Sequence, residues 1–392
     1  MTPAIPRLST YLDETDTDGY LVDATGDDST QYYLSGYHAP DEFVTLYADG
    51  TVAVLVSPLE YTRAKTDSDA DDVRNYAEFG YRETAARMDP RRAQKLVTAE
   101  FLADYGVESV AVPVSFPTGT ADLLREHGVA VTAGFDYVVA DEVRAVKSDR
   151  ELEHIRQTQQ ANEVALADVE DLLARASVAD GVLHLDGEVL TSERVRRRIE
   201  RTLLGEDCAM DQCIVASGPS AARAHDSGSG PLEADVPIVV DVFPRHKETR
   251  YFGDVTRTFV KGEVTDQVEE WYDRTVEAFE AALDTIEAGV SGEAVNAAVC
   301  DVFEDAGYPT LRTHDSPEDG FFHSTGHGVG LDVHEAPYLA ENGGDLEPGH
   351  VVTVEPGLYE QGTGGVRLED LVVVTEDGYE NLTDYPRDLR VV

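Results

Sequence analysis

The sequence is poor in cysteine, in lysine and in long apolar runs. Its three cysteines, Cys208, Cys213 and Cys300, are too few for a disulfide-stapled scaffold, and no signal-peptide pattern precedes them, so we expect reduced thiols and a cytoplasmic protein. No second Cys or His pair follows Cys208 and Cys213 at zinc-finger spacing, which disfavours a site of that type. No window approaches the ~18 uninterrupted apolar residues of a membrane span, so we expect a soluble chain with no membrane partner.

Positive charge is also scarce. The 392 residues include 31 basic and 77 acidic side chains, which gives a formal net charge of −46, and only five of the basic residues are lysines. A nucleic-acid partner bound through charge is excluded, because phosphate contacts need clustered Lys and Arg. Self-repulsion at this charge density destabilises a compact state unless salt screens it, so the composition predicts a halophilic protein that works in molar salt.

The length suits about two domains, and the first third alternates strand and helix signals. Residues 43–48 and 51–56 are β-rich and are joined by Asp49-Gly50, a hairpin signal. A helical pattern runs from Pro90 to a stop at Gly106, and the apolar run 107–112 then predicts a buried strand. These units predict a small α/β domain.

Ser148 and Glu151 form a capping-box pattern that opens a long amphipathic helix, so we place the domain boundary just before it. Residues 1–146 are predicted to form the N-terminal domain and residues 147–392 a second, C-terminal domain. Helices are expected at 192–204, 265–287 and 291–305, and strands at 214–216, 238–243, 254–260, 351–354 and 366–375. This order predicts an α+β domain with helices packed on a largely antiparallel sheet.

Four carboxylates stand on or beside these apolar strands. Asp241 follows the run Ile238-Val-Val-Val240, Asp254 begins a β-rich segment, Glu355 follows Val351-Val-Thr-Val354, and Glu369 precedes another apolar strand. A carboxylate at the end of a buried strand is costly unless it is paired or binds a cation.

Three of the eleven histidines fall within twelve positions, at His323, His327 and His334. The glycines at 326, 328 and 330 argue against a helix, so the four-residue spacing of the first two histidines is not a zincin motif. These glycines let the backbone approach closely, which suits imidazoles directed into a crowded site.

Charge then favours a metal centre. Four converging carboxylates and one neutral imidazole repel one another strongly, whereas two divalent cations cancel the four negative charges. Such a pair can hold a bridging hydroxide that acts as the nucleophile of a hydrolase. Oxygen-rich ligands with a single histidine favour Mn²⁺, with Co²⁺ and Zn²⁺ as the other candidates.

Five segments in this order resemble the pita-bread metallopeptidases, a family of prolidases (Xaa-Pro dipeptidases), Xaa-Pro aminopeptidases, methionine aminopeptidases and the metal-free creatinases. The segments are Asp241, Asp254-Val-Thr-Arg-Thr-Phe259, His323 to Glu335, Val354-Glu-Pro-Gly357 and Val366-Arg-Leu-Glu-Asp370. The resemblance extends from about residue 147 to the C-terminus. It implies a curved, largely antiparallel sheet with helices.

The resemblance also implies the metal ligands. By that likeness Asp241 holds one cation, Asp254 and Glu369 bridge both, and His327 and Glu355 complete the other. Glu355 is in addition the expected proton shuttle to the leaving amine.

Four further residues match catalytic positions of the family. His225 resembles a histidine that contacts substrate near the scissile bond, and His323 and His334 match those that line the pocket and support the tetrahedral intermediate. Arg367 resembles the residue that orients a bridging carboxylate.

The N-terminal third is similar to the creatinase/prolidase N-terminal domain, most visibly at Tyr32-Tyr-Leu-Ser-Gly-Tyr37. Methionine aminopeptidases usually lack this domain, so its presence favours the proline-directed branch. The resemblance therefore implies hydrolysis of the Xaa-Pro bond in dipeptides or short peptides by a homodimer. It does not separate dipeptidase from aminopeptidase.

The first ligand motif departs from the family, which usually has Asp-x-Gly where this chain has Asp241-Val-Phe243. An enlarged basic loop, 244–250, follows. Either it is a solvated hairpin tip, or Arg245, His246, Lys247 or Arg250 supplies positive charge for a substrate carboxylate. Two alternatives to a peptidase therefore stay open: a pita-bread binding protein without peptidase activity, and a creatinase-like hydrolase active without metal.

Overall fold

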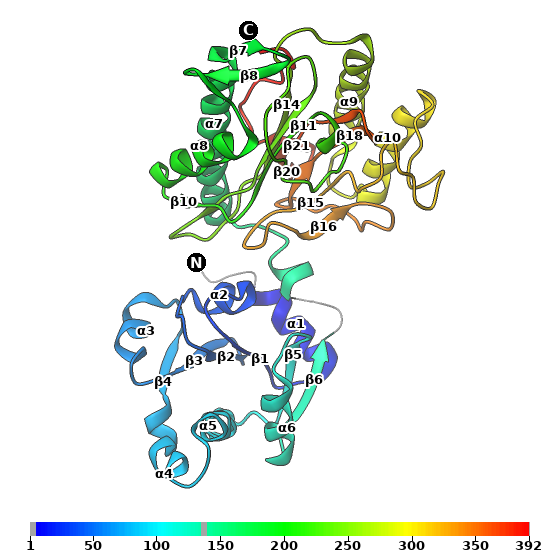
Figure 1. Cartoon of the computed structure of the whole chain (residues 1–392). Coiled ribbons are helices and arrows are strands. Elements are labelled where there is room, and N and C mark those ends of the chain that lie inside the picture. Colours follow the sequence, from blue (N-terminus) through cyan, green and yellow to red (C-terminus); the bar gives the residue numbers. More distant parts are fainter. Residues whose placement is uncertain (1–4, 135–138, 392) are drawn as a thin grey trace. The chain divides into compact units, whose positions relative to one another are not determined.

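The structure is a computed structural model that describes residues 5–134 and 139–391, and it divides into two compact units, residues 1–144 and 145–392 (Figure 1). Within the described ranges, every helix is too short or too polar to cross a bilayer. The units are a mixed α/β unit and a larger α+β unit, so the predicted fold class is confirmed.

The N-terminal unit is built on one six-stranded mixed sheet with the strand order β4-β3-β2-β1-β5-β6. Its strands are β1 (Gly19–Ala24), β2 (Phe43–Ala48), β3 (Thr51–Val56), β4 (Asp72–Asn75), β5 (Ser109–Pro113) and β6 (Ala130–Gly134). Its helices are α1 (Ile5–Thr15), α2 (Ser29–Ser35), α3 (Tyr61–Asp67), α4 (Tyr81–Ala85), α5 (Pro90–Asp104) and α6 (Thr118–Glu126).

The β2–β3 hairpin turns where the sequence predicts. Asp49 and Gly50 both have positive φ, 48° and 75°, as a two-residue hairpin turn requires. Successive residues of the strands then face opposite sides of the sheet. Leu46 and Leu55 pack in a core with α5 and α6, whereas Val54 packs in a second core on the other face.

The C-terminal unit contains four longer helices and several small antiparallel sheets. The helices are α7 (Asp149–Arg175), α8 (Ser192–Gly205), α9 (Asp266–Thr285) and α10 (Gly292–Asp305). The outer strands are β7 (Ser177–Ala179), β8 (Val182–Leu185), β9 (Glu188–Val189), β10 (Cys208–Ala209), β13 (Arg245–His246), β16 (Glu335–Leu339) and β21 (Gly378–Asn381). The strands around the site are β11 (Cys213–Ser217), β12 (Ile238–Val242), β14 (Val255–Phe259), β15 (Gly326–Gly328), β17 (Val351–Val354), β18 (Gly357–Glu360), β19 (Gly364–Arg367) and β20 (Asp370–Thr375).

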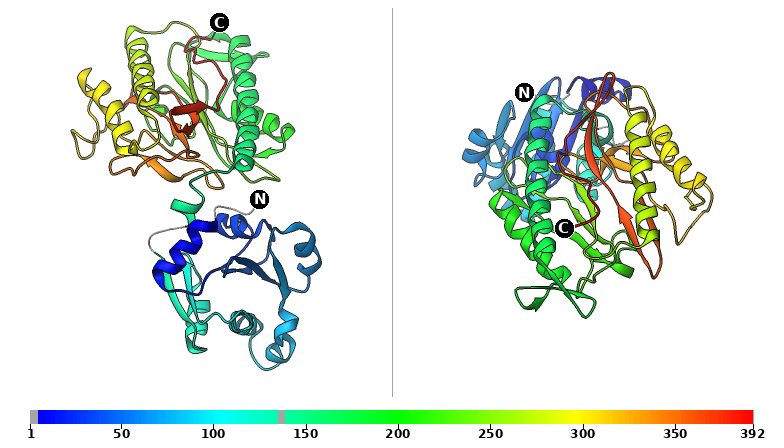
Figure 2. Two further views of the ribbon diagram at one scale, coloured as in Figure 1. Left: turned by 180° about the vertical axis from the view of Figure 1, so that it is seen from behind. Right: turned by 90° about the horizontal axis from the view of Figure 1, so that it is seen from above.

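This unit has two halves, each with its own core. Helices α7 and α8 pack on the sheet β11-β12-β14, whereas α9 and α10 pack on the sheet β16-β15-β17-β20-β21. The helix pairs flank the strands on opposite sides, as the views in Figures 1 and 2 agree in showing. The strand faces turned away from the helices are left to form a site between the halves.

Helix α7 begins with the predicted capping box: the Ser148 side chain accepts from the backbone N–H of Glu151, whose carboxylate accepts from the Ser148 N–H in return. The predicted strand 366–375, in contrast, is interrupted. It ends as β19 at Arg367 and resumes as β20 at Asp370, because the backbone of Glu369 pairs with Thr256 of the other half. The prediction of one continuous strand was therefore wrong at Glu369, because the break depends on a contact with a distant segment that the local sequence does not indicate.

Candidate metal centre

The first two carboxylates are brought together by strand register. Asp241 in β12 lies opposite Thr256 in β14, and Asp254 is two residues before Thr256 on the same face. The neighbours Val240, Val242 and Val255 point the other way into the core under α7 and α8. The apolar alternation of these strands therefore places both aspartates on the face that lacks a helix.

The two glutamates come from the other half by the same geometry. Val354 pairs with Asp370 at the end of the β17–β20 ladder, so Glu355 and Glu369 lie side by side just beyond it. Val354 packs in the core under α9, which turns the residues on either side to the opposite face. The Thr256–Glu369 bridge then joins the two sheets beside all four carboxylates.

His327 projects from the short strand β15 toward the carboxylates. Its Nδ1 donates to the carbonyl oxygen of Gly328 at 3.1 Å, which leaves the Nε2 lone pair free to bind a cation. Nε2 lies 3.4 Å from Glu355 Oε1 and 3.8 Å from Asp254 Oδ2. The glycines permit this approach, because a Cβ at Gly328 would lie 2.2 Å from the carbonyl oxygen of Ala336.

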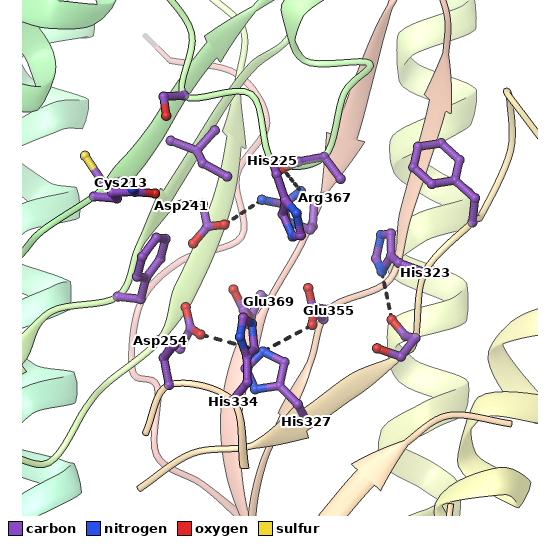
Figure 3. Close-up of a pocket in the computed structure, with 18 of the residues that line it drawn as sticks. Cys213, His225, Asp241, Asp254, His323, His327, His334, Glu355, Arg367 and Glu369 are labelled. Atoms are coloured by element: carbon purple, nitrogen blue, oxygen red, sulfur yellow. Dashed lines mark hydrogen bonds and ion pairs between the residues drawn. The ribbon is translucent and has the colours of Figure 1, made fainter. Parts of the chain in front are cut away.

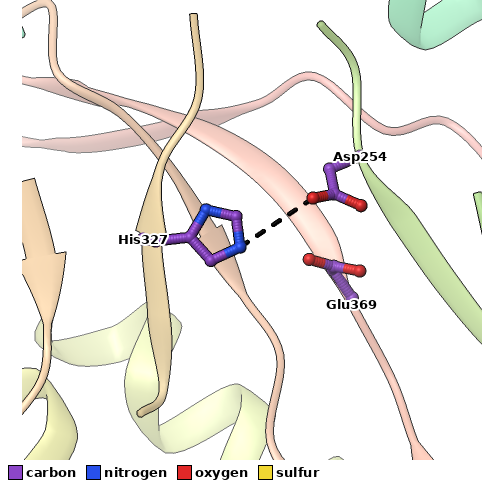
Figure 4. A group of neighbouring side chains, drawn as sticks. All are labelled: Asp254, His327 and Glu369. Atoms are coloured by element: carbon purple, nitrogen blue, oxygen red, sulfur yellow. Dashed lines mark ion pairs between the residues drawn. The ribbon is translucent and has the colours of Figure 1, made fainter. Parts of the chain in front are cut away.

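One ligand atom each from Asp254, His327 and Glu369 lies within 4.8 Å of the others, and all three residues are buried (Figure 4). Glu355 adjoins this group through His327. Asp241 stands outside it, with Oδ2 bound to Arg367 Nη2 at 2.6 Å and with its buried Oδ1 lacking a hydrogen-bond partner. A buried carboxylate oxygen without a donor is the kind of atom that a cation satisfies.

Burial raises the pKa of all four carboxyl groups. For Asp254 and Glu369 the pKa lies well above the ordinary value, first because of burial and then because neighbouring carboxylates repel a further negative charge. Burial raises the pKa of Glu355 to about 7, and that of Asp241 rises despite the Arg367 guanidinium. Burial also lowers the pKa of His327 to about 3, so its imidazole is neutral.

The donor set fits divalent cations. Four carboxylates supply oxygen ligands and one neutral imidazole supplies nitrogen, and repulsion between the carboxylates adds to burial in raising the pKa of Asp254 and Glu369. Hard or borderline cations such as Mn²⁺ prefer this mixture, whereas a structural zinc site is usually built from cysteines and histidines.

The stabilisation conferred by Mn²⁺ is expected to grow with pH. A carboxyl group whose pKa is raised in the folded state stabilises the metal-free fold at low pH and loses that contribution as the pH rises. For Glu355 the window runs from the ordinary value of 4.5 to about 7. A cation that replaces these protons therefore adds most above this window. Urea unfolding followed by the fluorescence of Trp271, the single tryptophan, with and without Mn²⁺ at several pH values measures the gain. A gain that shrinks as the pH rises would contradict this expectation.

Arg367 organises the rim of the cluster. Its direct carboxylate partner is Asp241, and it reaches Glu369 through Thr256, whose hydroxyl accepts from Arg367 Nε at 3.3 Å and donates to Glu369 Oε2 at 2.8 Å. Arg367 therefore contacts Glu369, one of the two carboxylates expected to bridge the cations, through Thr256 and not directly. The reason is the register of β12 with β14, which puts Thr256 between the guanidinium and Glu369.

Tyr359 is a site residue that the sequence did not indicate. Its hydroxyl accepts from Arg367 Nη1 at 3.1 Å and lies 2.9 Å from His323 Nε2. Since His323 Nδ1 donates to the Ser324 carbonyl and burial lowers the pKa of this histidine to about 3, the Tyr359 hydroxyl donates to Nε2. Both ring nitrogens of His323 are therefore engaged. The one available signal was the position of Tyr359 on the strand that follows Glu355-Pro-Gly357.

All nine residues predicted for the site line one cavity of about 800 Å³. Figure 3 shows their side chains projecting into it from both halves of the unit. The His334 ring stands edge-on to His327 with 4.2 Å between the ring centroids, and both His225 and His334 are exposed. The lining also includes large apolar and aromatic side chains, namely Ile214, Phe243, Phe322, Val333 and Tyr338.

The basic loop 244–250 contributes no residue to this lining as the structure describes it. Its residues Arg245 and His246 form β13 against β10, and His246 and Arg250 are buried, whereas Lys247 is exposed. His246 Nε2 lies 3.3 Å from the Gln157 amide of α7. The loop is therefore packed on the outer side of the β-strands rather than being a fully solvated tip.

Comparisons with known proteins agree with this geometry. Residues 153–376 match the model of metallopeptidase family M24, and residues 5–146 match that of the creatinase/prolidase N-terminal domain. The Xaa-Pro dipeptidase of Pyrococcus horikoshii is 25% identical, with 99% of each chain covered. The solved Xaa-Pro dipeptidase from Bacillus anthracis superposes with a TM-score of 0.81 at 24% identity, covering 99% of each chain. The solved X-Pro aminopeptidase from Thermotoga maritima gives 0.76 at 26% identity, over 96% of this chain and 98% of that one.

Proposed function

The chain belongs to metallopeptidase family M24, and we propose that it hydrolyses the Xaa-Pro bond of dipeptides or short peptides with two divalent cations. The observation that carries this proposal is the convergence of ligand atoms from Asp254, His327 and Glu369 beside Glu355 in one cavity. The Xaa-Pro activity named for relatives that span the whole chain supports the proline-directed substrate. A cavity of about 800 Å³ is of the size that accommodates a small ligand.

The cations would be held by Asp241, Asp254, His327, Glu355 and Glu369, with Mn²⁺ the preferred metal. When bound, such a pair acidifies a water molecule and polarises the peptide carbonyl. In this proposal residues 147–392 form the catalytic domain.

In this proposal Glu355 carries out the proton transfers. Its carboxylate lines the cavity beside the other ligands, so it can contact both the attacking water and the scissile bond. It takes a proton from the attacking water and passes it to the proline nitrogen, which leaves as a secondary amine. Arg367 fixes the Asp241 carboxylate meanwhile through the 2.6 Å ion pair.

The histidines have different tasks in the proposal. His225 and His334 are exposed at the cavity and can donate N–H groups to the substrate carbonyl as negative charge develops on its oxygen. His323 is neutral and is held by Tyr359, so it lines the pocket with its ring, and a hydrogen bond from it to the intermediate requires that contact to break.

The proposal is tested with purified protein in Mn²⁺ and high salt. Xaa-Pro dipeptides and longer Xaa-Pro-Yaa peptides should be cleaved before proline, and matched peptides with alanine in place of proline should be cleaved more slowly. The comparison of the two lengths separates a dipeptidase from an aminopeptidase. Failure to cleave any proline peptide would overturn the substrate assignment.

Removal of metal with EDTA is expected to abolish this hydrolysis, and added Mn²⁺ should restore it, because the cluster supplies ligands but no nucleophile of its own. The measurement is the initial rate before chelation, after dialysis and after Mn²⁺ is returned. Full activity in the chelated protein would instead support a creatinase-like reaction.

A homodimer, a cytoplasmic location and adaptation to molar salt remain proposals. The net charge of −46 supports the last of these. Sedimentation in high and low salt would test the oligomeric state and the salt requirement together.

A further inference from the structure

Gln159, which is not one of the clustered carboxylates, makes two hydrogen bonds to the backbone of Asp254. It lies in helix α7 and is completely buried. Its Oε1 accepts from the Asp254 backbone N–H at 3.0 Å, and its Nε2 donates to the Asp254 carbonyl at 2.9 Å. The carboxamide therefore makes the two hydrogen bonds that a neighbouring strand would otherwise make.

Such a substitute is needed at this residue. The ladder between β12 and β14 ends at the pair Val242–Val255, so Asp254 lies just beyond the last strand partner. A residue at the end of a ladder is held less firmly than one inside it, yet this one carries a carboxylate of the proposed metal centre.

The orientation of the Gln159 amide is fixed by two further contacts. Oε1 also accepts from Asn162 Nδ2 at 3.2 Å, and Nε2 also donates to Thr383 Oγ1 at 2.8 Å. All the hydrogen-bonding positions of the carboxamide are thus used. Rotation of the amide by half a turn would set its NH₂ group against the Asp254 N–H, so the arrangement has one solution.

Gly253 leaves the space that the Gln159 side chain needs to reach the Asp254 backbone. A Cβ at that position would lie 2.9 Å from Gln159 Oε1 and 3.1 Å from the Gln159 backbone nitrogen. Its backbone carries φ outside the left-handed region, so close approach rather than an unusual conformation accounts for glycine there.

We propose that Gln159 is a positioning residue of the metal centre, whose carboxamide holds the Asp254 backbone so that the carboxylate meets the cations without further ordering. This inference rests on the proposed function, because it needs a metal at Asp254. Removal of a partner that orients a metal ligand typically weakens metal affinity about 10- to 100-fold, and we expect a loss of that size.

The test compares Gln159→Met with Gln160→Met. Methionine has nearly the shape of glutamine but makes neither hydrogen bond to Asp254, whereas Gln160 is exposed on the same helix and serves as the matched control. Titration of the metal-free proteins with Mn²⁺ should give a dissociation constant about 10- to 100-fold higher for Gln159→Met and an unchanged one for Gln160→Met.

A second measurement separates positioning from general loss of structure. At saturating Co²⁺ the visible absorption bands report the geometry of the ligands, so they should change in Gln159→Met and stay the same in Gln160→Met.

A second variant, Gly253→Ala, disturbs the same contact, because the added Cβ would lie too close to Gln159 Oε1. It should weaken Mn²⁺ binding similarly. If Gln159→Met does not fold, Gly253→Ala and Gln159→Glu carry the test, since the latter keeps the acceptor for the Asp254 N–H and loses the donor to its carbonyl.

The outcomes distinguish the inference from the function on which it depends. A wild-type protein that binds no Mn²⁺ and cleaves no proline peptide overturns the proposed function. A wild-type protein that binds Mn²⁺, with unchanged affinity and unchanged Co²⁺ spectrum in the folded Gln159 variants, overturns the positioning role alone.

Discussion

Replacement of Glu355 by glutamine is expected to lower kcat for Xaa-Pro hydrolysis about 10²- to 10⁴-fold, the range that general acid–base catalysis supplies. The amide keeps an oxygen that can face a cation and keeps the volume of the side chain, but it cannot accept and return a proton. Metal should therefore remain bound in large part while turnover is lost. Steady-state kinetics on a proline dipeptide, with metal content measured on the same samples, tests both halves of this expectation.

Glu360→Gln is the matched control for that variant. Glu360 ends β18, five residues beyond Glu355, and it does not belong to the residues that line the cavity. Its change should leave kcat and metal content as in the wild type. If Glu355→Gln retained wild-type turnover, another group would have to move the proton. If it lost the metal entirely, the ligand role would outweigh the catalytic one.

Much of the fold could be predicted because local signals and tertiary structure agree. Asp49-Gly50 adopts the positive φ angles that a hairpin needs, and Ser148 with Glu151 caps the long helix α7. The carboxylates of the site were visible for a related reason. Each stands in, directly before or directly after an apolar strand, and a charge in such a place needs a partner that the neighbouring sequence does not provide.

The supporting residues could not be predicted, because their function depends on contacts between distant segments. Gln159 is 95 residues from Asp254, and Thr256 is 113 residues from Glu369. On its own, a glutamine in an amphipathic helix or a threonine in a strand is unremarkable. The break between β19 and β20 at Glu369 could not be predicted for the same reason. The backbone of Glu369 pairs with Thr256 of the other sheet, and nothing in the sequence near either residue indicates that pairing.

A large loss of stability is expected when Arg257 is replaced. This residue lies in β14 with 1% of its surface exposed. Its Nη2 forms an ion pair with Asp370 Oδ1 at 2.8 Å, and its Nη1 donates to the carbonyl of Glu369 at 2.6 Å. Further donors reach the carbonyls of Tyr385 and Pro386, so one side chain ties the two sheets to the C-terminal segment. Loss of a buried partner costs about 3–5 kcal/mol, because the other charge stays buried.

Arg257→Met should therefore lower the free energy of unfolding of the C-terminal unit by about that amount, 3–5 kcal/mol. Asp370 retains Arg387 at 2.6 Å, which favours the lower end of the range. The same substitution at Arg390, whose ion pair with Glu269 is exposed, should cost less than about 1 kcal/mol. Trp271 is a residue of α9 whose side chain is buried in the core of the C-terminal unit, so its fluorescence during urea unfolding reports on this unit and not on the N-terminal one. An equal loss in the free energy of unfolding for the two substitutions would show that Arg257 does not hold the two halves together. Some other contact would then have to keep Asp254 next to Glu369.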